Sequence, residues 1–175
     1  IAFAVGDVSG NGPEAAAVTA LVRHTLRALS MSESRPEVLL QGLNEAMLNA
    51  RPVGAETFCT AVVAVAQVGE GVELRVASGG HPHPLIRRND DGVEVVELGG
   101  NLLGALDPIT VAVADVSLSP GDTMVLYTDG VTDARRDGSF FEIDGVIAVL
   151  CQPAPDAASL AGSVERAVLR HVGGQ

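Results

Sequence analysis

Apolar residues in the first part of the chain change from a strand-like run to a helical spacing. Residues 1–7 are almost all apolar, which predicts a buried strand. Pro13 and Glu14 suit the first turn of a helix, and apolar residues then recur every three or four positions. These positions are Val18, Val22, Leu26 and Leu29. The pattern therefore predicts a strand followed by a long amphipathic helix.

A second helix is predicted directly after the first. Ser34 and Glu37 have the spacing of a capping box, in which each side chain bonds a backbone N–H at the helix start. The apolar positions that follow form a stripe for burial: Leu39, Leu43, Ala46, Met47 and Ala50.

From residue 57 onward the apolar period shortens to that of strands. Three pairs of runs rich in β-branched residues are each split by a turn containing Gly with Asp, Glu or Pro, which is typical of hairpins. The predicted pairs are 57–68 with 72–78, 84–88 with 93–98, and 109–118 with 123–127. The middle of the chain is therefore predicted to be an antiparallel meander.

The C-terminal part returns to helical spacing. Residues 142–151 predict one helix, and Asp156 is placed to cap another. The last helix carries Leu160, Val164, Ala167, Val168 and His171. A strand, two helices, several strands and further helices is an α+β order rather than a βαβ order. We predict a four-layer α-β-β-α sandwich, with two antiparallel sheets flanked by helices, in a single domain over residues 1–175.

Composition and charge exclude several classes of protein. The chain is 47% hydrophobic but only 3% aromatic, so Ala, Val, Leu and Ile must fill the core. A net charge of -11 argues against a nucleic-acid partner. The longest apolar run, residues 61–66, is far below the roughly 20 residues that span a bilayer, so no membrane insertion is expected.

The cysteines and the termini set two further expectations. Cys59 and Cys151 are far apart and lie in no CxxC or Cys/His cluster, so we expect reduced thiols and a cytoplasmic location. The sequence starts inside a predicted strand and without Met, so we expect a fragment truncated at both ends.

The most informative residues are two aspartates, each of which follows an apolar run. Asp7 precedes Val8-Ser9-Gly10-Asn11-Gly12, and Asp129 precedes Gly130. A carboxylate at a strand end, beside glycines that let the backbone turn tightly, suits a divalent cation. Each aspartate alone is better explained by a helix cap or an ordinary turn, but two carboxylates brought together would repel unless a cation lay between them.

Two other interpretations of the glycine-rich turn are weaker. Residues 10–15 fit G-x-G-x-x-A, the dinucleotide-binding pattern, but a second helix follows where that fold needs a parallel strand. Ser9 does not fit a hydrolase nucleophile elbow, because Asp7 stands where that motif has Gly. Turn chemistry is the simpler role for Ser9 and Asn11.

The segment Ser78-Gly79-Gly80-His81-Pro82-His83-Pro84 is also distinctive. Its two imidazoles could bind a metal, but His-Pro segments are commonly rigid turns. We expect a structural role, with His81 lining the site.

Taken together, these motifs resemble the SpoIIE-type branch of metal-dependent serine/threonine protein phosphatases, the PPM family related to protein phosphatase 2C. They occur in the family's order and span nearly the whole chain. The matching pieces are residues 6–12 with 15–16, 57–60, 78–82, 103–104, 120–122 and 127–134.

The resemblance implies a site with two Mn²⁺ or Mg²⁺ ions. By analogy Asp7 bridges both ions, the Val8 backbone carbonyl reaches one, and Asp129 binds the second. Asp7 and Asp129 are then the catalytic residues, and a water between the ions attacks phosphorus without a covalent intermediate.

Three positions depart from the family pattern. Ser9 stands where eukaryotic relatives have a candidate general acid, His, so the leaving oxygen must take its proton from water or another group. Asp133 replaces the usual Glu, and Phe141-Glu142 replaces Phe-Gly.

Some of the family's acidic ligands have no counterpart in the chain. They come from strands that would precede Ile1 and follow His171. Neither Asp144 nor Asp156 matches those positions by motif, so the fragment is expected to bind metal weakly or not at all.

The expected function is dephosphorylation of phosphoserine or phosphothreonine on a regulatory protein. The resemblance implies a STAS-type anti-sigma-factor antagonist as substrate and an N-terminal sensor domain in the parent chain. The first alternative is a catalytically inactive pseudophosphatase that acts as a protein-interaction domain. A nucleotide-dependent oxidoreductase that binds NAD through Gly10 and Gly12 is a weaker one.

Overall fold

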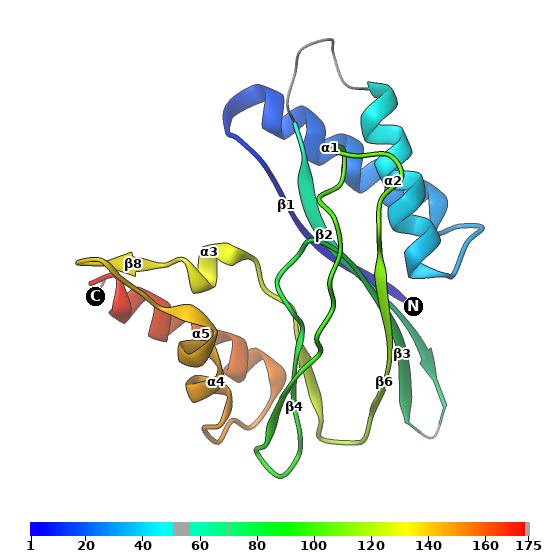
Figure 1. The fold of residues 1–175 in the computed structure, drawn as a ribbon. Helices are drawn as coiled ribbons and strands as arrows, with labels where there is room; N and C mark the ends of the chain where they lie inside the picture. The colour runs from blue at the N-terminus through cyan, green and yellow to red at the C-terminus, as the bar shows by residue number, and fades with distance from the viewer. Residues whose placement is uncertain (51–56, 70, 174–175) are drawn as a thin grey trace. The chain divides into compact units, whose positions relative to one another are not determined.

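The computed structural model describes residues 1–50, 57–69 and 71–173, which belong to two compact units (Figure 1). The first unit comprises Ile1–His81 and Glu97–Leu118. The second comprises Pro82–Val96 and Ser119–Gln175. Each unit has its own sheet and its own buried cluster.

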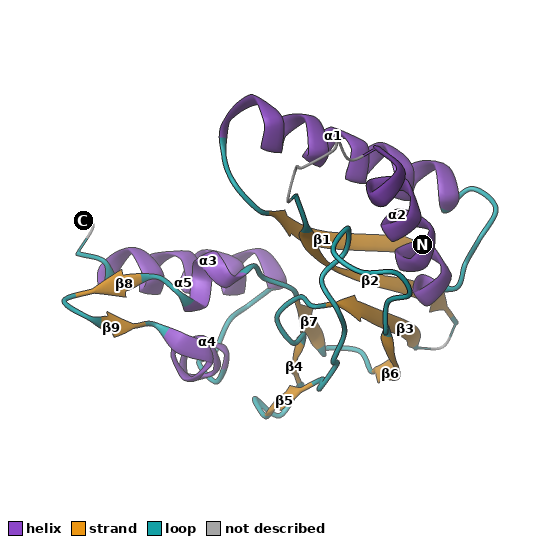
Figure 2. Ribbon diagram, turned by 45° about the horizontal axis from the view of Figure 1, so that its top comes forward, coloured by secondary structure: helices purple, strands orange, loops and turns teal. Residues whose placement is uncertain are grey.

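A four-stranded antiparallel sheet forms the first unit, in the order β1-β2-β3-β6. Its strands are β1 (Ala2–Val8), β2 (Cys59–Val68), β3 (Val72–Gly79) and β6 (Ala112–Leu118). Helices α1 (Gly12–Leu29) and α2 (Pro36–Ala50) lie along one face of this sheet, as Figure 2 shows. The buried side chains between helices and sheet are Leu39, Leu40, Leu43, Met47, Cys59, Ala61, Val63, Ala77 and Leu103.

The first strand is less buried than its sequence predicts. Among the described strands β1 has a neighbour only on its β2 side, and Ile1 and Phe3 remain 74% and 50% exposed. The prediction of a buried strand is therefore wrong, although the strand itself is confirmed. Apolar composition alone does not distinguish an edge strand from a central one.

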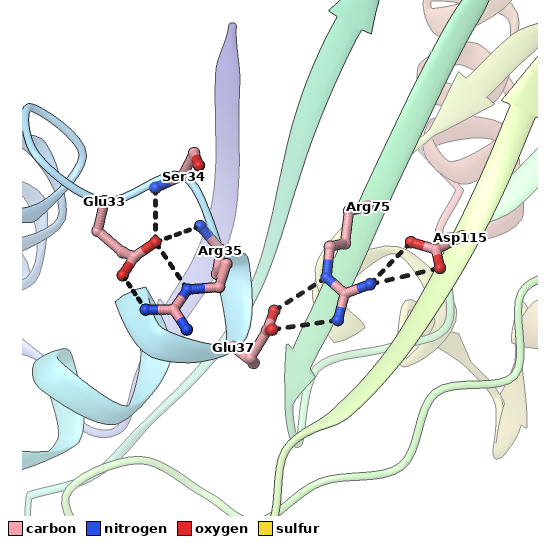
Figure 3. Close-up of polar contacts among 6 residues, drawn as sticks. All are labelled: Glu33, Ser34, Arg35, Glu37, Arg75 and Asp115. Carbon is pink, nitrogen blue, oxygen red and sulfur yellow. Dashed lines mark hydrogen bonds and ion pairs between the residues drawn. The ribbon is translucent and has the colours of Figure 1, made fainter.

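The capping box predicted for α2 is also wrong. The Glu33 carboxylate accepts hydrogen bonds from the backbone N–H groups of Ser34 and Arg35, at 2.8 Å each, and pairs with the Arg35 guanidinium (Figure 3). These bonds lower the pKa of Glu33 to about 2, with the Arg35 side chain as the largest cause. Glu33 therefore accepts the Ser34 N–H that the box assigned to Glu37, and α2 begins at Pro36.

Glu37 forms an ion pair with a residue of the sheet instead. Its carboxylate binds the Arg75 guanidinium at 3.1 Å, and Arg75 also pairs with Asp115 at 3.1 Å (Figure 3). The hydrogen bond from Arg75 lowers the pKa of Glu37. This chain of charges joins the first turn of α2 to β3 and β6.

The second unit contains a three-stranded antiparallel sheet in the order β5-β4-β7. Its strands are β4 (Leu85–Arg87), β5 (Val93–Val95) and β7 (Thr123–Val125). The elements that follow β7 are α3 (Asp129–Thr132), β8 (Arg135–Arg136), β9 (Ser139–Phe140), α4 (Glu142–Leu150) and α5 (Ala157–His171). A buried cluster holds them together: Leu85, Tyr127, Val146, Leu150 and Leu160. The predicted cap of the last helix is confirmed, because Asp156 accepts the Ser159 N–H at 2.7 Å.

One of the three predicted hairpins does not form. β6 pairs with β3 and β7 pairs with β4, so the turn between them connects two sheets. The Asp122 carboxylate binds Arg88 and accepts the Asn89 N–H. These bonds tie the start of β7 to the end of β4, which explains why β7 does not return along β6.

The other two hairpins and the predicted element order are confirmed. The α+β class, with antiparallel sheets flanked by helices, is therefore correct. β1 and β2 are antiparallel and two helices lie between them, so no parallel βαβ unit supports a dinucleotide site. No helix within the described residues has the length and apolar character needed to cross a membrane.

Arg87 shows how the second unit is held together. This β4 residue is only 8% exposed, and its Nε donates to the Leu150 carbonyl oxygen at 2.8 Å, at the end of α4. The guanidinium also pairs with Asp91. A cation at a helix C-terminus satisfies free carbonyl groups and interacts favourably with the helix dipole.

Replacing Arg87 with Met should therefore destabilise the protein. Loss of a buried, charged hydrogen bond is expected to lower the free energy of unfolding by about 2–3 kcal/mol, measured by urea denaturation. The matched control is Arg35→Met, because Arg35 is 63% exposed and pairs only locally with Glu33. An Arg87→Met midpoint equal to that of Arg35→Met would contradict this role.

Candidate functional site

Asp7 lies near the end of β1, directly opposite Thr60 on β2. The adjacent Gly6 is required by the closeness of the two strands, because a Cβ at this position would lie 2.7 Å from the Thr60 carbonyl oxygen. Cys59 and Ala61 belong to the core beneath the helices. Since side chains alternate along a strand, Asp7 and Thr60 point to the opposite face of the sheet.

The turn after Asp7 is held by Ser9. Its N–H donates to the Phe58 carbonyl oxygen at 2.9 Å, and its Oγ accepts the Phe58 N–H at 3.1 Å. Gly10 and Gly12 follow with φ values of 93° and 77°, which favour glycine. Turn chemistry is therefore the role of Ser9 that the structure supports. Asn11 is the N-cap residue of α1 but makes no side-chain capping bond.

A cavity of about 480 Å³ lies between β1, β2 and α1. Asp7, Val8 and Thr60 are among its lining residues. Ala2, Ala4 and Gly6 of β1 also line it.

Asp129 is the first residue of the four-residue helix α3. It follows Tyr127, which is 8% exposed and packs in the second unit's core. The Asp129 carbonyl oxygen accepts the Asp133 N–H at 2.7 Å and the Thr132 hydroxyl at 3.1 Å. The backbone around Asp129 is thus fixed on both sides, while its carboxylate is exposed.

Glycine is not sterically required at position 130. A Cβ there would meet only the Thr128 Oγ1 at 3.5 Å, an ordinary contact, so crowding beside Asp129 does not require glycine. Asp133, which replaces the family's usual Glu, lies at the end of α3 and is exposed. A cavity of about 510 Å³ is lined by Thr132, Asp133, Phe140, Glu142 and Ile143.

The Asp7 and Asp129 carboxylates have the chemistry of cation ligands. Both are exposed, and neither makes an ion pair or side-chain hydrogen bond with another described residue. Carboxylate oxygens are the hard ligands that Mg²⁺ and Mn²⁺ prefer, so these residues fit such an ion. Val8 is the last residue of β1, so its backbone carbonyl is a further oxygen next to Asp7 in the chain.

Asp7 belongs to the first unit and Asp129 to the second. Their convergence on one site therefore remains a prediction. Within the described residues, no three or more His, Cys, Asp or Glu side chains gather as a metal site. The other candidate acids have separate places, with Asp144 exposed in the first turn of α4 and Asp156 at the N-cap of α5.

The nearby thiol is not suited to nucleophilic chemistry. Cys59 is 1% exposed, and its Sγ lies 3.4 Å from the Met47 sulfur. Burial, with a smaller contribution from the negative charge of Asp7, raises the pKa of Cys59 to about 12. A thiol that stays protonated at neutral pH is a poor nucleophile and a poor metal ligand.

His81 lies beside the residue that faces Asp7. Its ring Nδ1 is 2.8 Å from the Thr60 Oγ1, and its backbone N–H donates to the Ser78 Oγ at 3.2 Å. Gly80 precedes it with a φ of 71°. The expected structural role of this segment is supported, but spacing in the sequence gives no signal that His81 and Thr60 are partners.

Comparison with known proteins assigns the family. The family model described as Stage II sporulation protein E (SpoIIE) matches residues 1–175. The phosphoserine phosphatase RsbU of Bacillus subtilis is 29% identical over 143 residues, covering 81% of this chain and 42% of RsbU. The chain spans less than half the length of the curated relatives it matches.

Solved structures agree on the fold. The RsbU and RsbW domains of a Mycobacterium tuberculosis protein match with a TM-score of 0.77 and 26% identity, over 98% of this chain and 48% of that one. The PP2C phosphatase domain of Bacillus subtilis SpoIIE gives 0.79 at 17% identity, over 99% and 50%. RsbX, solved in complex with magnesium, gives 0.64 at 13% identity, over 98% and 74%. On the match of its whole length to the family model, the chain belongs to the SpoIIE family of PP2C-like phosphatases.

Proposed function

We propose that the chain is the catalytic part of a metal-dependent phosphatase that removes phosphate from phosphoserine or phosphothreonine on a regulatory protein. The observation that carries this proposal is that Asp7 and Asp129 each combine a fixed backbone with an exposed carboxylate. Each is fixed by its backbone next to a buried strand or core residue, yet each carboxylate is exposed and makes no bond to another described side chain. Family membership supports the same reaction class.

Asp7, the Val8 carbonyl and Asp129 would hold the divalent cations. When bound, two such ions supply a water of lowered pKa and neutralise charge on the phosphoryl oxygens. The protein's own contribution is to hold the ligands in place. β1–β2 pairing fixes Asp7, and the buried Tyr127 anchors the segment that leads to Asp129.

Ser9 is not arranged as a proton donor for the leaving oxygen. Its Oγ accepts the Phe58 N–H, and an ordinary hydroxyl is far too weak an acid to act near neutral pH. The proton would come from solvent or from a group on the substrate.

The physiological substrate that we propose is a phosphorylated STAS-type anti-sigma-factor antagonist, with a sensor domain elsewhere in the parent chain. The relative named phosphoserine phosphatase RsbU supports phosphoserine as the group that is hydrolysed, and the STAS-type protein is proposed from the family resemblance alone. The net charge of -11 is consistent with a protein substrate rather than a nucleic acid.

The first test is substitution of the proposed ligands in the full-length protein. Asp7→Asn and Asp129→Asn should each lower phosphate release from a phosphoserine peptide with Mn²⁺ by at least about a hundredfold, because each removes a charged ligand. The matched control is Asp137→Asn, since Asp137 is exposed and has a φ of 51°, which Asn tolerates. Wild-type rates in both ligand variants would reject the site.

The second test is removal of metal. EDTA should abolish phosphate release by the wild-type protein, and excess Mn²⁺ or Mg²⁺ should restore it, because solvent water is otherwise too poor a nucleophile. Full activity in EDTA would exclude metal-dependent hydrolysis. If the folded protein releases no phosphate with either ion, the alternative is favoured, in which the domain acts only in protein interactions.

A further inference from the structure

Three residues form a row across the first unit, on the face of the sheet opposite α1 and α2. Asp7 on β1 pairs with Thr60 on β2, and Thr60 contacts His81 just beyond β3. Directly opposed residues in an antiparallel ladder have Cβ atoms about 5 Å apart, within reach of side-chain hydrogen bonding. The Thr60 hydroxyl therefore has two acceptors within reach, the Asp7 carboxylate on one side and the His81 imidazole on the other.

The structure places the Thr60 hydroxyl against the His81 ring. Thr60 Oγ1 lies 2.8 Å from His81 Nδ1, and no bond joins it to Asp7 among the described contacts. In the Nε2–H tautomer of His81, Nδ1 accepts the single Thr60 hydroxyl proton, so Thr60 has no proton left to donate to Asp7. The Asp7 carboxylate then keeps all of its lone pairs for other ligands.

His81 is held firmly enough to act in this way. His81 is 4% exposed. The Ser78 hydroxyl accepts the backbone N–H of His81 at 3.2 Å and donates to its backbone carbonyl oxygen at 3.4 Å. Gly79 and Gly80 allow the close packing of this segment, because a Cβ on Gly79 would lie 2.7 Å from the Leu103 side chain. The ring is therefore fixed by its backbone as well as by Thr60.

We propose that His81 is a positioning residue that keeps the Thr60 hydroxyl away from Asp7, so that the Asp7 carboxylate remains open to a divalent cation. This inference rests on the proposed function, because it assumes that Asp7 is a metal ligand. Without the imidazole, the Thr60 hydroxyl would rotate and donate to the carboxylate, a charge-assisted bond that competes with the cation. The loss of cation affinity in a His81 variant would therefore be caused by the Thr60 hydroxyl.

The test measures Mn²⁺ affinity of the full-length protein by isothermal titration calorimetry. His81→Phe keeps a ring but offers no acceptor, and it should weaken Mn²⁺ binding about tenfold, the effect of one competing hydrogen bond to a charged group. His81→Asn places an amide near the former Nδ1 and should bind within about threefold of wild type. The double variant His81→Phe/Thr60→Val lacks the competing hydroxyl and should also recover wild-type affinity.

Recovery in the double variant separates positioning from structural damage, which a second substitution would not repair. Thermal unfolding in EDTA checks that each variant is folded, and His81→Leu replaces His81→Phe if the latter does not fold. Unchanged affinity in the single variant, or weak binding that Thr60→Val does not restore, would overturn the inference.

The outcomes also separate this inference from the proposed function. If the affinity pattern appears but the wild-type protein releases no phosphate, the proposed phosphatase activity fails and the positioning role stands. If wild-type activity is present and all His81 variants bind Mn²⁺ normally, only the positioning role fails. Absence of Mn²⁺ binding by the wild-type protein would overturn both.

Discussion

The close pairing of β1 with β2 is the constraint on which the candidate site depends. The strands approach closely at Gly6, where a Cβ would collide with the Thr60 carbonyl oxygen. Any larger residue would separate the strands at the position where Asp7 faces Thr60. The glycine therefore matters for strand spacing, and the acid beside it owes its position to that spacing.

Asp129, the second acidic residue, is positioned by a different kind of interaction. Asp129 is positioned by a hydrophobic core rather than by strand pairing, because Tyr127, two residues earlier, is buried with Leu85, Val146 and Leu150. Arg87 joins β4 to the end of α4 and so stabilises the same core. In both units a buried neighbour fixes the backbone while the carboxylate stays exposed, which is the arrangement that a preorganised metal ligand requires.

Much of the fold was predictable because its elements have strong local signals. The helices, the two short hairpins and the Asp156 cap follow from apolar period and turn chemistry. The errors arise where a distant partner decides the outcome. The Glu37 carboxylate pairs with Arg75 instead of completing a capping box. Asp122, just before β7, binds Arg88 and the Asn89 N–H just after β4.

The candidate site follows the same division. Asp7 and Asp129 were proposed from two local patterns considered together, each a strand end followed by a turn. The pairing of Thr60 with His81 depends on how β2 and β3 are aligned, and residue spacing alone does not reveal it. Family resemblance identified both segments but assigned neither side chain a role.

The central claim is that Asp7 and Asp129 bind one cluster of ions. The most direct measurement is a crystal structure of the full-length protein with Mn²⁺, with the ions located by their anomalous scattering. The account predicts two manganese peaks, both within coordination distance of the Asp7 carboxylate and one of them also within coordination distance of Asp129. Manganese bound at neither residue, or the two carboxylates on remote surfaces, would contradict it.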